Sequence, residues 1–210
     1  MNTDIDFPRP YKAHLMRPIH AVSTCIVFLL IAFLINKFFY TESLISMLQG
    51  GKPLLTQLGF GMLIGSGYAL LSLFVFMIGG RYIAWVGQVW AQMIRLLDKA
   101  DLSGLNFIWF SISAGIGEEL LFRGALQPII GMWWTAVIFV LFHSWTGEIN
   151  SVNWKKLIYL ATTFAASVML SCVCIYFGLV AAIIAHISID IILMFVGKQL
   201  RGGNEQQESR

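Results

Sequence analysis

Long runs of apolar residues dominate the chain and define its predicted elements. A membrane-spanning helix needs about 20 mostly apolar residues, and six runs are candidates for one. They lie at about 19–39, 54–78, 105–129, 130–145, 157–177 and 179–196. The fourth run is short, and charged residues interrupt the third. We therefore expect one membrane domain, 1–210, with an all-α fold: a polytopic bundle of about six transmembrane helices.

The segment 84–97 differs from these runs. It is apolar on one side, whereas Gln88, Gln92 and Arg95 fall on the other side. A helix with opposed apolar and polar faces is typical of the membrane interface. We predict an interfacial helix here in addition to the spans.

Composition excludes several classes of protein. Of the 210 residues, 58% are hydrophobic and only 12% are charged, against about 25% charged in a typical soluble domain. Too few polar side chains remain to cover a water-facing surface, so an ordinary soluble domain is excluded. The net charge of +3 is not gathered into a phosphate-binding patch, so the expected surroundings are a lipid bilayer and no nucleic acid.

Lysine and arginine are unevenly divided between the two sides of the predicted bundle. If the N-terminus is cytoplasmic and the chain crosses six times, only Lys37 and Lys52 lie outside, and Arg123 lies within a span. The cytoplasmic set is then Arg9, Lys12, Arg17, Arg81, Arg95, Lys99, Lys155, Lys156, Lys198, Arg201 and Arg210. Because cytoplasmic loops carry an excess of these residues, we predict an integral membrane protein with both termini in the cytoplasm. The compact chain favours a bacterial plasma membrane.

Small residues recur in the second run, with Gly61 and Gly65 in a GxxxG spacing. This spacing lets two helices approach closely, either in a dimer or within one chain. We favour packing within the chain, and the pattern assigns no oligomeric state.

Six ionisable residues lie at membrane depth, on three of the predicted helices. They are Glu118, Glu119, Arg123, His143, His186 and Asp190. A charge at the bilayer centre costs at least about 2.5–3.5 kcal/mol, so each needs a partner, a water-filled cavity or neutralisation. A structural ion pair without chemistry would explain one Arg–Glu pair. Two further acids and two histidines exceed what such a pair needs, so we favour a functional site.

Helical spacing predicts how these side chains pair. Glu119 and Arg123 are four residues apart and share a face. His186 and Asp190 have the same spacing, so Asp190 is expected to fix the orientation of the His186 ring. Glu118 lies about 100° around the helix from Glu119 and should make different contacts.

Three short motifs follow one another, each on its own predicted helix. Residues 118–123 form EExxxR, residues 139–143 form FxxxH and residues 186–190 form HxxxD. In this order they resemble the CPBP family, the CAAX prenyl endopeptidases and bacteriocin-processing enzymes also called Abi. The resemblance covers about 105–196, the expected catalytic core. It implies an intramembrane protease that cleaves a peptide bond of a hydrophobic or lipid-anchored peptide or protein.

The resemblance also implies a role for each motif residue. Glu118 matches the glutamate that acts as general base on a water molecule, and His143 matches the histidine that shares this water. His186 and Asp190 match the pair that stabilises the oxyanion.

Two further points follow from the resemblance. Glu119 and Arg123 match the remaining motif residues, with a more structural role. Asp190 departs from the eukaryotic-type prenyl proteases, which have Asn at this place. An ionised Asp cannot donate a hydrogen bond to an oxyanion, so His186 would have to donate, with Asp190 holding it.

The same residues suit peptide hydrolysis on chemical grounds. A carboxyl group can take a proton from water and later return it to the leaving amine. No serine or cysteine lies in a recognisable nucleophile motif, so direct attack by water is expected, with no cofactor. The alternative is a zinc ion held by Glu118, His143 and His186 with an open fourth position, although HExxH is absent.

Two other functions would use similar residues. Intramembrane acids and histidines also mark ion and proton pathways, but the internal repeats of secondary transporters are not evident. A non-catalytic scaffold or bacteriocin-immunity protein that keeps the motif residues is the third hypothesis.

Depth along the helices raises a geometric question. At 1.5 Å per residue from the cytoplasmic ends, Glu118 lies roughly 20 Å deep and His186 roughly 16 Å deep. His143, in contrast, lies two residues from the predicted helix end at Trp145. A shared site requires the three to converge, so we expect this helix to continue past Trp145, to tilt, or to end elsewhere.

Overall fold

The computed structural model describes residues 16–40, 44–97, 99–146 and 154–208. Its helices are α1 (Pro18–Phe39), α2 (Leu44–Gln49), α3 (Leu54–Leu73), η1 (Phe74–Ile78), α4 (Gly79–Tyr82), α5 (Ala84–Leu97), α6 (Asn106–Glu119), η2 (Leu120–Leu126), α7 (Gln127–Thr146), α8 (Trp154–Phe177) and α9 (Leu179–Glu208). The segments η1 and η2 are π-helical. Across the described ranges the fold is an all-α polytopic bundle, as predicted.

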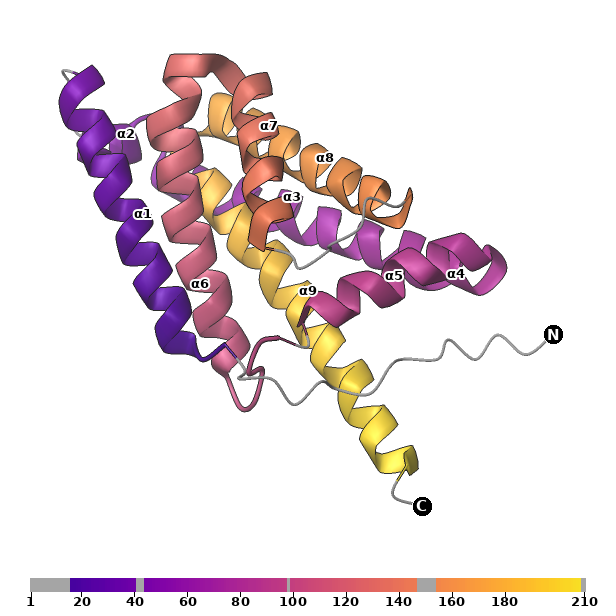
Figure 1. Ribbon diagram of the computed structural model, residues 1–210. Helices are drawn as coiled ribbons and strands as arrows, with labels where there is room; N and C mark the ends of the chain where they lie inside the picture. The colour runs from indigo at the N-terminus through magenta and orange to yellow at the C-terminus, as the bar shows by residue number, and fades with distance from the viewer. Residues whose placement is uncertain (1–15, 41–43, 98, 147–153, 209–210) are drawn as a thin grey trace.

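Within the described residues, five helical segments are long and apolar enough to cross a membrane. They are Pro18–Phe39, Leu54–Tyr82, Asn106–Ser144, Lys156–Phe177 and Leu179–Leu200. The third segment changes direction at Gly131, which has a φ of 78° and a ψ of 165°. Figure 1 shows α6 and η2 running one way and α7 returning beside them. The five segments therefore contain the six predicted runs, with the third and fourth separated at Gly131.

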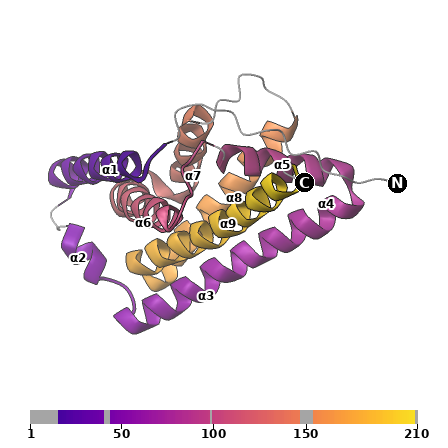
Figure 2. The ribbon, with the colours of Figure 1, turned by 90° about the horizontal axis from the view of Figure 1, so that it is seen from below.

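Helix α9 lies at the centre of the bundle and contacts α3, α6 and α8. Figure 2 shows α3 running along α9, with α1 at the opposite edge beside α6. Glycines permit the close approach of α3: a Cβ atom on Gly61 would lie 2.6 Å from the carbonyl oxygen of Ala181, and one on Gly65 would collide with the backbone of Ala185. The GxxxG spacing thus serves packing within the chain, the alternative that the sequence favoured.

Helix α5 has the bounds predicted for the interfacial helix. Its apolar side packs on the protein, where buried Val89 and Trp90 contact Phe76 of η1. The helix folds back on α4, and Gly80 and Gly87 bring the two backbones together, since a Cβ atom on Gly80 would lie 2.9 Å from the Cα of Gly87. The apolar face of α5 is therefore covered by the bundle.

Helix α6, which carries the two central acids, begins at a polar turn. The backbone N–H of Ser103 donates to Asp101 Oδ1 at 3.0 Å, and Asn106 Nδ2 donates to Oδ2 at 3.1 Å. Hydrogen bonds from Ser103 and Asn106, with the charge of Arg17, hold the pKa of the Asp101 carboxyl below its usual value. The backbone N–H of Asn106, the first residue of α6, donates to the carbonyl oxygen of Ser103 at 3.0 Å, so this turn supplies a partner that the helix itself lacks at its start.

Backbone contacts distinguish the two ends of the bundle. At one end a parallel bridge joins Met16, before α1, to Ala100, before α6, and Lys198 of α9 donates to the carbonyl of Gly104 at 2.6 Å. At the other end, the connections α2–α3 and α8–α9 share a backbone hydrogen bond of 3.0 Å. The start of α1 and the later part of α9 thus lie at the same end. Arg9, Lys12 and Arg210 of the predicted cytoplasmic set lie outside the described residues.

Helix α9 continues beyond its apolar span. The last apolar run was expected to end at about 196, and the span ends at Leu200, while the helix continues to Glu208. Polar residues follow the apolar run, and the loss of apolar character ends a span without ending a helix. The limit of hydropathy therefore does not mark the limit of secondary structure here.

Candidate active site

Two adjacent acids and an arginine lie where α6 passes into η2. Glu118 and Glu119 are the last residues of α6, and Arg123 lies in η2. Arg123 Nη1 donates to Glu119 Oε1 at 2.9 Å, and both side chains are 0% exposed. The pair that helical spacing predicted is therefore present and fully buried. Wide π-helical turns inserted in α-helices occur frequently at functional sites.

Arg123 also binds α8 and α7. Its Nη2 donates to the carbonyl oxygen of Ser167 at 2.9 Å and to the hydroxyl at 2.8 Å. Its guanidinium lies over the ring of Phe139, 4.7 Å from the centroid, in a cation–π contact. A buried charge needs an opposite charge and hydrogen bonds. Both terminal nitrogens of Arg123 have such partners, whereas Arg123 Nε and Glu119 Oε2 make no hydrogen bond to a described residue. Arg123 thereby links three helices around one buried ion pair.

Ser167 was not among the residues predicted from the sequence. Its signal is a stripe of hydroxyl residues in an apolar helix: Thr163, Ser167 and Ser171 are four residues apart and share one face of α8. Residues four apart on a helix are neighbours on its surface. Such a stripe identifies a polar face, but not its partner.

His186 takes its orientation from Glu119. Its Nδ1 lies 2.7 Å from Glu119 Oε1, whereas its Nε2 lies 3.6 Å from Asp190 Oδ2. The second distance is too long for a hydrogen bond. Because a carboxylate only accepts hydrogen bonds, Nδ1 is assigned as the donor. The expectation that Asp190 would orient the ring needs correction: an acid on another helix does so, and Asp190 lies beside the other nitrogen.

Glu118 faces a different histidine. Its Oε2 lies 3.8 Å from His143 Nε2, and both side chains are partly exposed. The other ring nitrogen of His143, Nδ1, lies 3.0 Å from the carbonyl oxygen of Phe139 and is assigned as the donor to it. Glu118 Oε2 and His143 Nε2 are too far apart for a direct hydrogen bond, but a water molecule can bridge them. The two adjacent acids thus make different contacts, as the 100° offset predicted, and the structure adds that each lies beside its own histidine.

The depth of His143 follows from the length of α7. Between Gly131 and its end at Thr146, α7 has 15 residues and a length of about 22 Å, short of the roughly 30 Å hydrocarbon core. Figure 1 shows α7 stopping part-way along α6. His143 is level with Glu118, which lies 12 residues into α6. Within the described residues α7 ends at Thr146, one residue past the predicted end at Trp145. The expectation that this end was at fault is therefore not confirmed, and His143 meets Glu118 because the short helix ends beside it.

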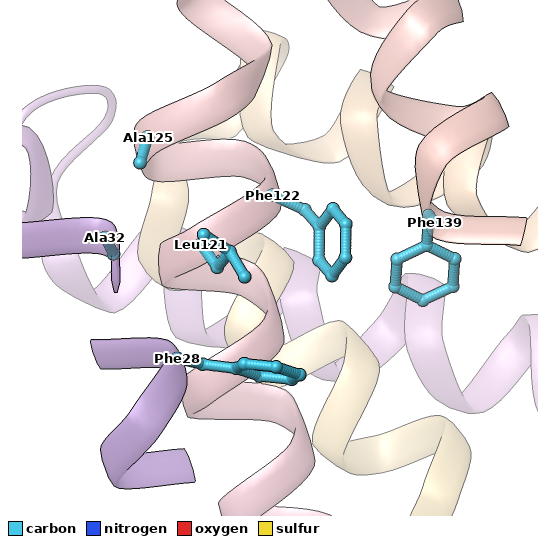
Figure 3. Packing of buried hydrophobic residues seen from close by; sticks show 6 residues of the cluster. All are labelled: Phe28, Ala32, Leu121, Phe122, Ala125 and Phe139. Atoms are coloured by element: carbon cyan, nitrogen blue, oxygen red, sulfur yellow. The ribbon is translucent and has the colours of Figure 1, made fainter. Parts of the chain in front are cut away.

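Phe139 connects the two groups of ionisable residues. Its ring stacks on His143 with 4.3 Å between centroids and lies edge-on to His186 at 6.4 Å. It also packs against Phe122 of η2 at 5.0 Å. Figure 3 shows these two phenylalanines facing one another, with Phe28 of α1 nearby. This apolar cluster joins α1 to η2 and α7 beside the site.

A cavity of about 220 Å³ opens beside these groups, and His143, His186 and Asp190 line it. Its other polar lining residues are Tyr68, Ser72, Tyr159, Thr162 and Thr163. Glu118 lies beside the lining residue His143, and Glu119, which is paired with Arg123, contacts the lining residue His186. Three of the six predicted site residues therefore line the cavity, and the other three lie behind them.

A zinc ion held by Glu118, His143 and His186 would require donor atoms of all three side chains to point to one place. In the described part of the chain, no three His, Cys, Asp or Glu side chains are arranged to hold a metal ion. Glu118 approaches His143, whereas His186 turns its Nδ1 towards Glu119. The ligand set Glu118, His143 and His186 is thus not preassembled.

Residues 101–192 match a protein family described as Type II CAAX prenyl endopeptidase Rce1-like. No curated protein and no solved structure matches the chain. The matched region includes the three motifs, and it is consistent with an intramembrane protease of the CPBP family. Together with the five apolar helical segments, the match makes the chain an integral membrane protein.

Proposed function

We propose that this chain, which carries an Rce1-like CAAX prenyl endopeptidase domain, cleaves a peptide bond in a hydrophobic or lipid-anchored peptide or protein by glutamate-activated water. The observation that supports this proposal most strongly is the pair Glu118 and His143, 3.8 Å apart, beside a cavity that His186 and Asp190 line. The match of residues 101–192 to a peptidase family favours hydrolysis over ion transport or a purely structural role.

The first step is attack by water on the substrate carbonyl. A water molecule held between Glu118 Oε2 and His143 Nε2 transfers a proton to Glu118 as its oxygen bonds to the carbonyl carbon. The hydrogen bond from His143 Nδ1 to the backbone leaves Nε2 as the acceptor that positions this water.

The negative charge that develops on the carbonyl oxygen needs a donor. His186 in its protonated form carries an Nε2–H that can bind this oxygen, while Glu119 holds Nδ1 at 2.7 Å and Asp190 lies 3.6 Å from Nε2. Two flanking carboxylates stabilise the imidazolium. A preorganised donor of this kind is worth about 10²–10³ in kcat.

The second step expels the amine. Collapse of the tetrahedral intermediate breaks the C–N bond, and Glu118 returns the proton that it took from water to the leaving nitrogen. One water molecule is consumed, and every side chain regains its starting charge. Neither step requires a covalent intermediate with the protein.

The membrane helices around the site indicate which substrates reach it and in which membrane the protein lies. A site enclosed by membrane helices receives substrates from the bilayer, and the proposed partners are therefore a membrane-associated peptide or protein and lipid, with no nucleic acid. We place the chain in a bacterial plasma membrane with both termini in the cytoplasm.

The variant Glu118→Gln tests the role of the base. Purified protein in proteoliposomes is given a fluorescence-quenched peptide with a prenylated cysteine. Because the amide cannot accept the proton, turnover should fall about 10²- to 10⁴-fold, with an unchanged melting temperature. Asp101→Asn, an acid-to-amide change outside the site, should retain turnover. Wild-type turnover by Glu118→Gln would remove Glu118 as the base.

Metal analysis of the same preparation separates the zinc alternative. We expect turnover to persist after treatment with a strong chelator. Stoichiometric zinc whose removal abolishes turnover, and whose return restores it, would contradict the metal-free mechanism.

A further inference from the structure

The proposed reaction needs hydrogen-bond donors at the carbonyl oxygen of the substrate, and His186 supplies one. Asp190 lies 3.6 Å from His186 Nε2, but an ionised carboxylate accepts hydrogen bonds and donates none. Its charge also repels the negative charge that develops on the carbonyl oxygen. A second neutral donor at this place would stabilise the transition state further.

Hydroxyl groups are the remaining candidate donors in the lining of the cavity. They belong to Tyr68, Ser72, Tyr159, Thr162 and Thr163. A hydroxyl has a single proton to donate. One that donates to a neighbour within the protein therefore has none left for a substrate.

Four of these hydroxyls are engaged in contacts within the bundle. Tyr68 donates to the carbonyl oxygen of Thr162 at 3.3 Å, and the Ser72 side chain hydrogen-bonds to the Tyr68 side chain. Thr162 and Thr163 both donate to the carbonyl oxygen of Tyr159, at 2.8 Å and 2.9 Å. The phenol of Tyr159 is the hydroxyl that remains.

The surroundings of the Tyr159 hydroxyl suit a donor to the substrate. Glu118 and Asp190 lie near enough for their charges to act on it, and Thr163 lies within hydrogen-bonding reach. A phenolic hydrogen turns about the C–O bond, so it can move from Thr163 to an acceptor in the cavity. Asp190 therefore has a potential donor on each side: Tyr159 from α8, and His186 from its own helix, α9.

We propose that Tyr159 is a further catalytic residue, whose hydroxyl donates to the carbonyl oxygen of the cleaved bond together with His186 Nε2. This inference rests on the proposed endopeptidase function. As water attacks the carbonyl carbon, the π electron pair moves to the oxygen, and both donors bind the resulting oxyanion. When the C–N bond breaks, the C=O double bond forms again and Tyr159 keeps its proton. Tyr159 lies within the matched region 101–192 but outside the three motifs.

A matched pair of variants tests this role in turnover. Tyr159→Phe removes one hydroxyl oxygen, and Tyr176→Phe makes the same change at an exposed position of α8. In proteoliposomes with the prenylated, fluorescence-quenched peptide, Tyr159→Phe should lower kcat about 10²- to 10³-fold. KM should change little, because this hydrogen bond is made mainly in the transition state. Tyr176→Phe should keep the kcat of the wild-type protein.

Direct binding separates contact with the carbonyl oxygen from a structural role. In one fluorescent, prenylated peptide a phosphinate replaces the cleaved amide, and its tetrahedral oxygens resemble the intermediate. In a second peptide an ethylene link carries no oxygen at this place. Tyr159→Phe should weaken binding of the phosphinate peptide about tenfold or more, because analogues of the transition state use its hydrogen bonds. Binding of the ethylene peptide should not change, whereas a structural defect would weaken both.

The outcomes separate this inference from the proposed function. If wild-type protein cleaves the substrate but Tyr159→Phe binds the phosphinate equally well, Tyr159 is not the donor and the endopeptidase stands. If wild-type protein neither cleaves the substrate nor prefers the phosphinate to the ethylene peptide, both proposals are contradicted. A melting temperature identifies a Tyr159→Phe protein that does not fold. In that case 3-fluorotyrosine at position 159, a more acidic donor, should bind the phosphinate more tightly, and equal affinity would contradict the inference.

Discussion

A continuous chain of side-chain contacts runs from α8 to the cavity. Ser167 accepts hydrogen bonds from Arg123, which donates to Glu119, and Glu119 in turn accepts from His186. Ser167 is fully buried and is not among the residues that line the cavity. We infer that it is a positioning residue, which acts on His186 through two intermediate charges.

A serine one turn further along α8 provides a matched control for this inference. Ser171 is also fully buried, and its hydroxyl makes no hydrogen bond to a described residue. Ser167→Ala should lower the free energy of unfolding by about 0.6–1.7 kcal/mol, the range for hydrogen bonds between membrane helices. It should also lower kcat with little change in KM, and Ser167→Thr should restore activity. Equal kcat values for Ser167→Ala and Ser171→Ala would contradict the positioning role.

Packing between α3 and α9 controls the position of the histidine helix. Gly65 faces the backbone of Ala185, the residue before His186, with no room for a Cβ atom. Two residues further along α3, Gly67 has no atom within 4 Å of where its Cβ would lie. The two glycines therefore separate a steric effect on α9 from the general effect of alanine on a helix.

Gly65→Ala should push α9 away from α3 and displace His186. We expect a loss of about 1–3 kcal/mol in the free energy of unfolding, as for other overpacked sites, together with reduced turnover. Gly67→Ala should be neutral or slightly stabilising, because alanine favours a helix more than glycine does. Chemical unfolding in detergent and the peptide assay measure both effects. Equal stability of the two variants would show that α3 and α9 do not pack this closely.

At the scale of the whole molecule, the bundle has two distinct ends and a site between them. Contacts at one end join the start of α1, the start of α6 and the later part of α9. The opposite end holds the α2–α3 and α8–α9 connections. An even number of crossings is implied, which agrees with the distribution of lysine and arginine.

Chemical labelling tests this arrangement and its predicted orientation. Single cysteines are placed at Lys52, Lys99 and Lys198 in a variant whose native cysteines are changed to alanine. In intact cells, a membrane-impermeant maleimide should label position 52 only. In inverted vesicles it should label positions 99 and 198 only. Labelling of 52 and 198 from the same side would contradict the fold, whereas a complete reversal would contradict only the orientation.

The amino-acid sequence by itself determined the elements and the candidate residues. Runs of apolar residues located the candidate membrane spans to within a few residues, because the thickness of a bilayer imposes their length. The six candidate residues stood out because they are ionisable residues within apolar runs. Burying a charge in lipid costs free energy, so such residues are rare unless they have a function. The Glu119–Arg123 pair was also predictable, because one helical repeat places both on the same face. The single domain 1–210 and the catalytic core 105–196 stay predictions.

Only the tertiary structure decided the partners of these residues. Glu119 and His186 are 67 residues apart, and Arg123 and Ser167 are 44 apart, so no local periodicity relates them. The depth of His143 depends on a turn at Gly131 that starts a short helix inside the bundle. The cavity likewise combines residues of η1, α5, α7, α8 and α9. Helix formation is governed by neighbours along the chain, whereas contacts between helices depend on how separate helices pack in space.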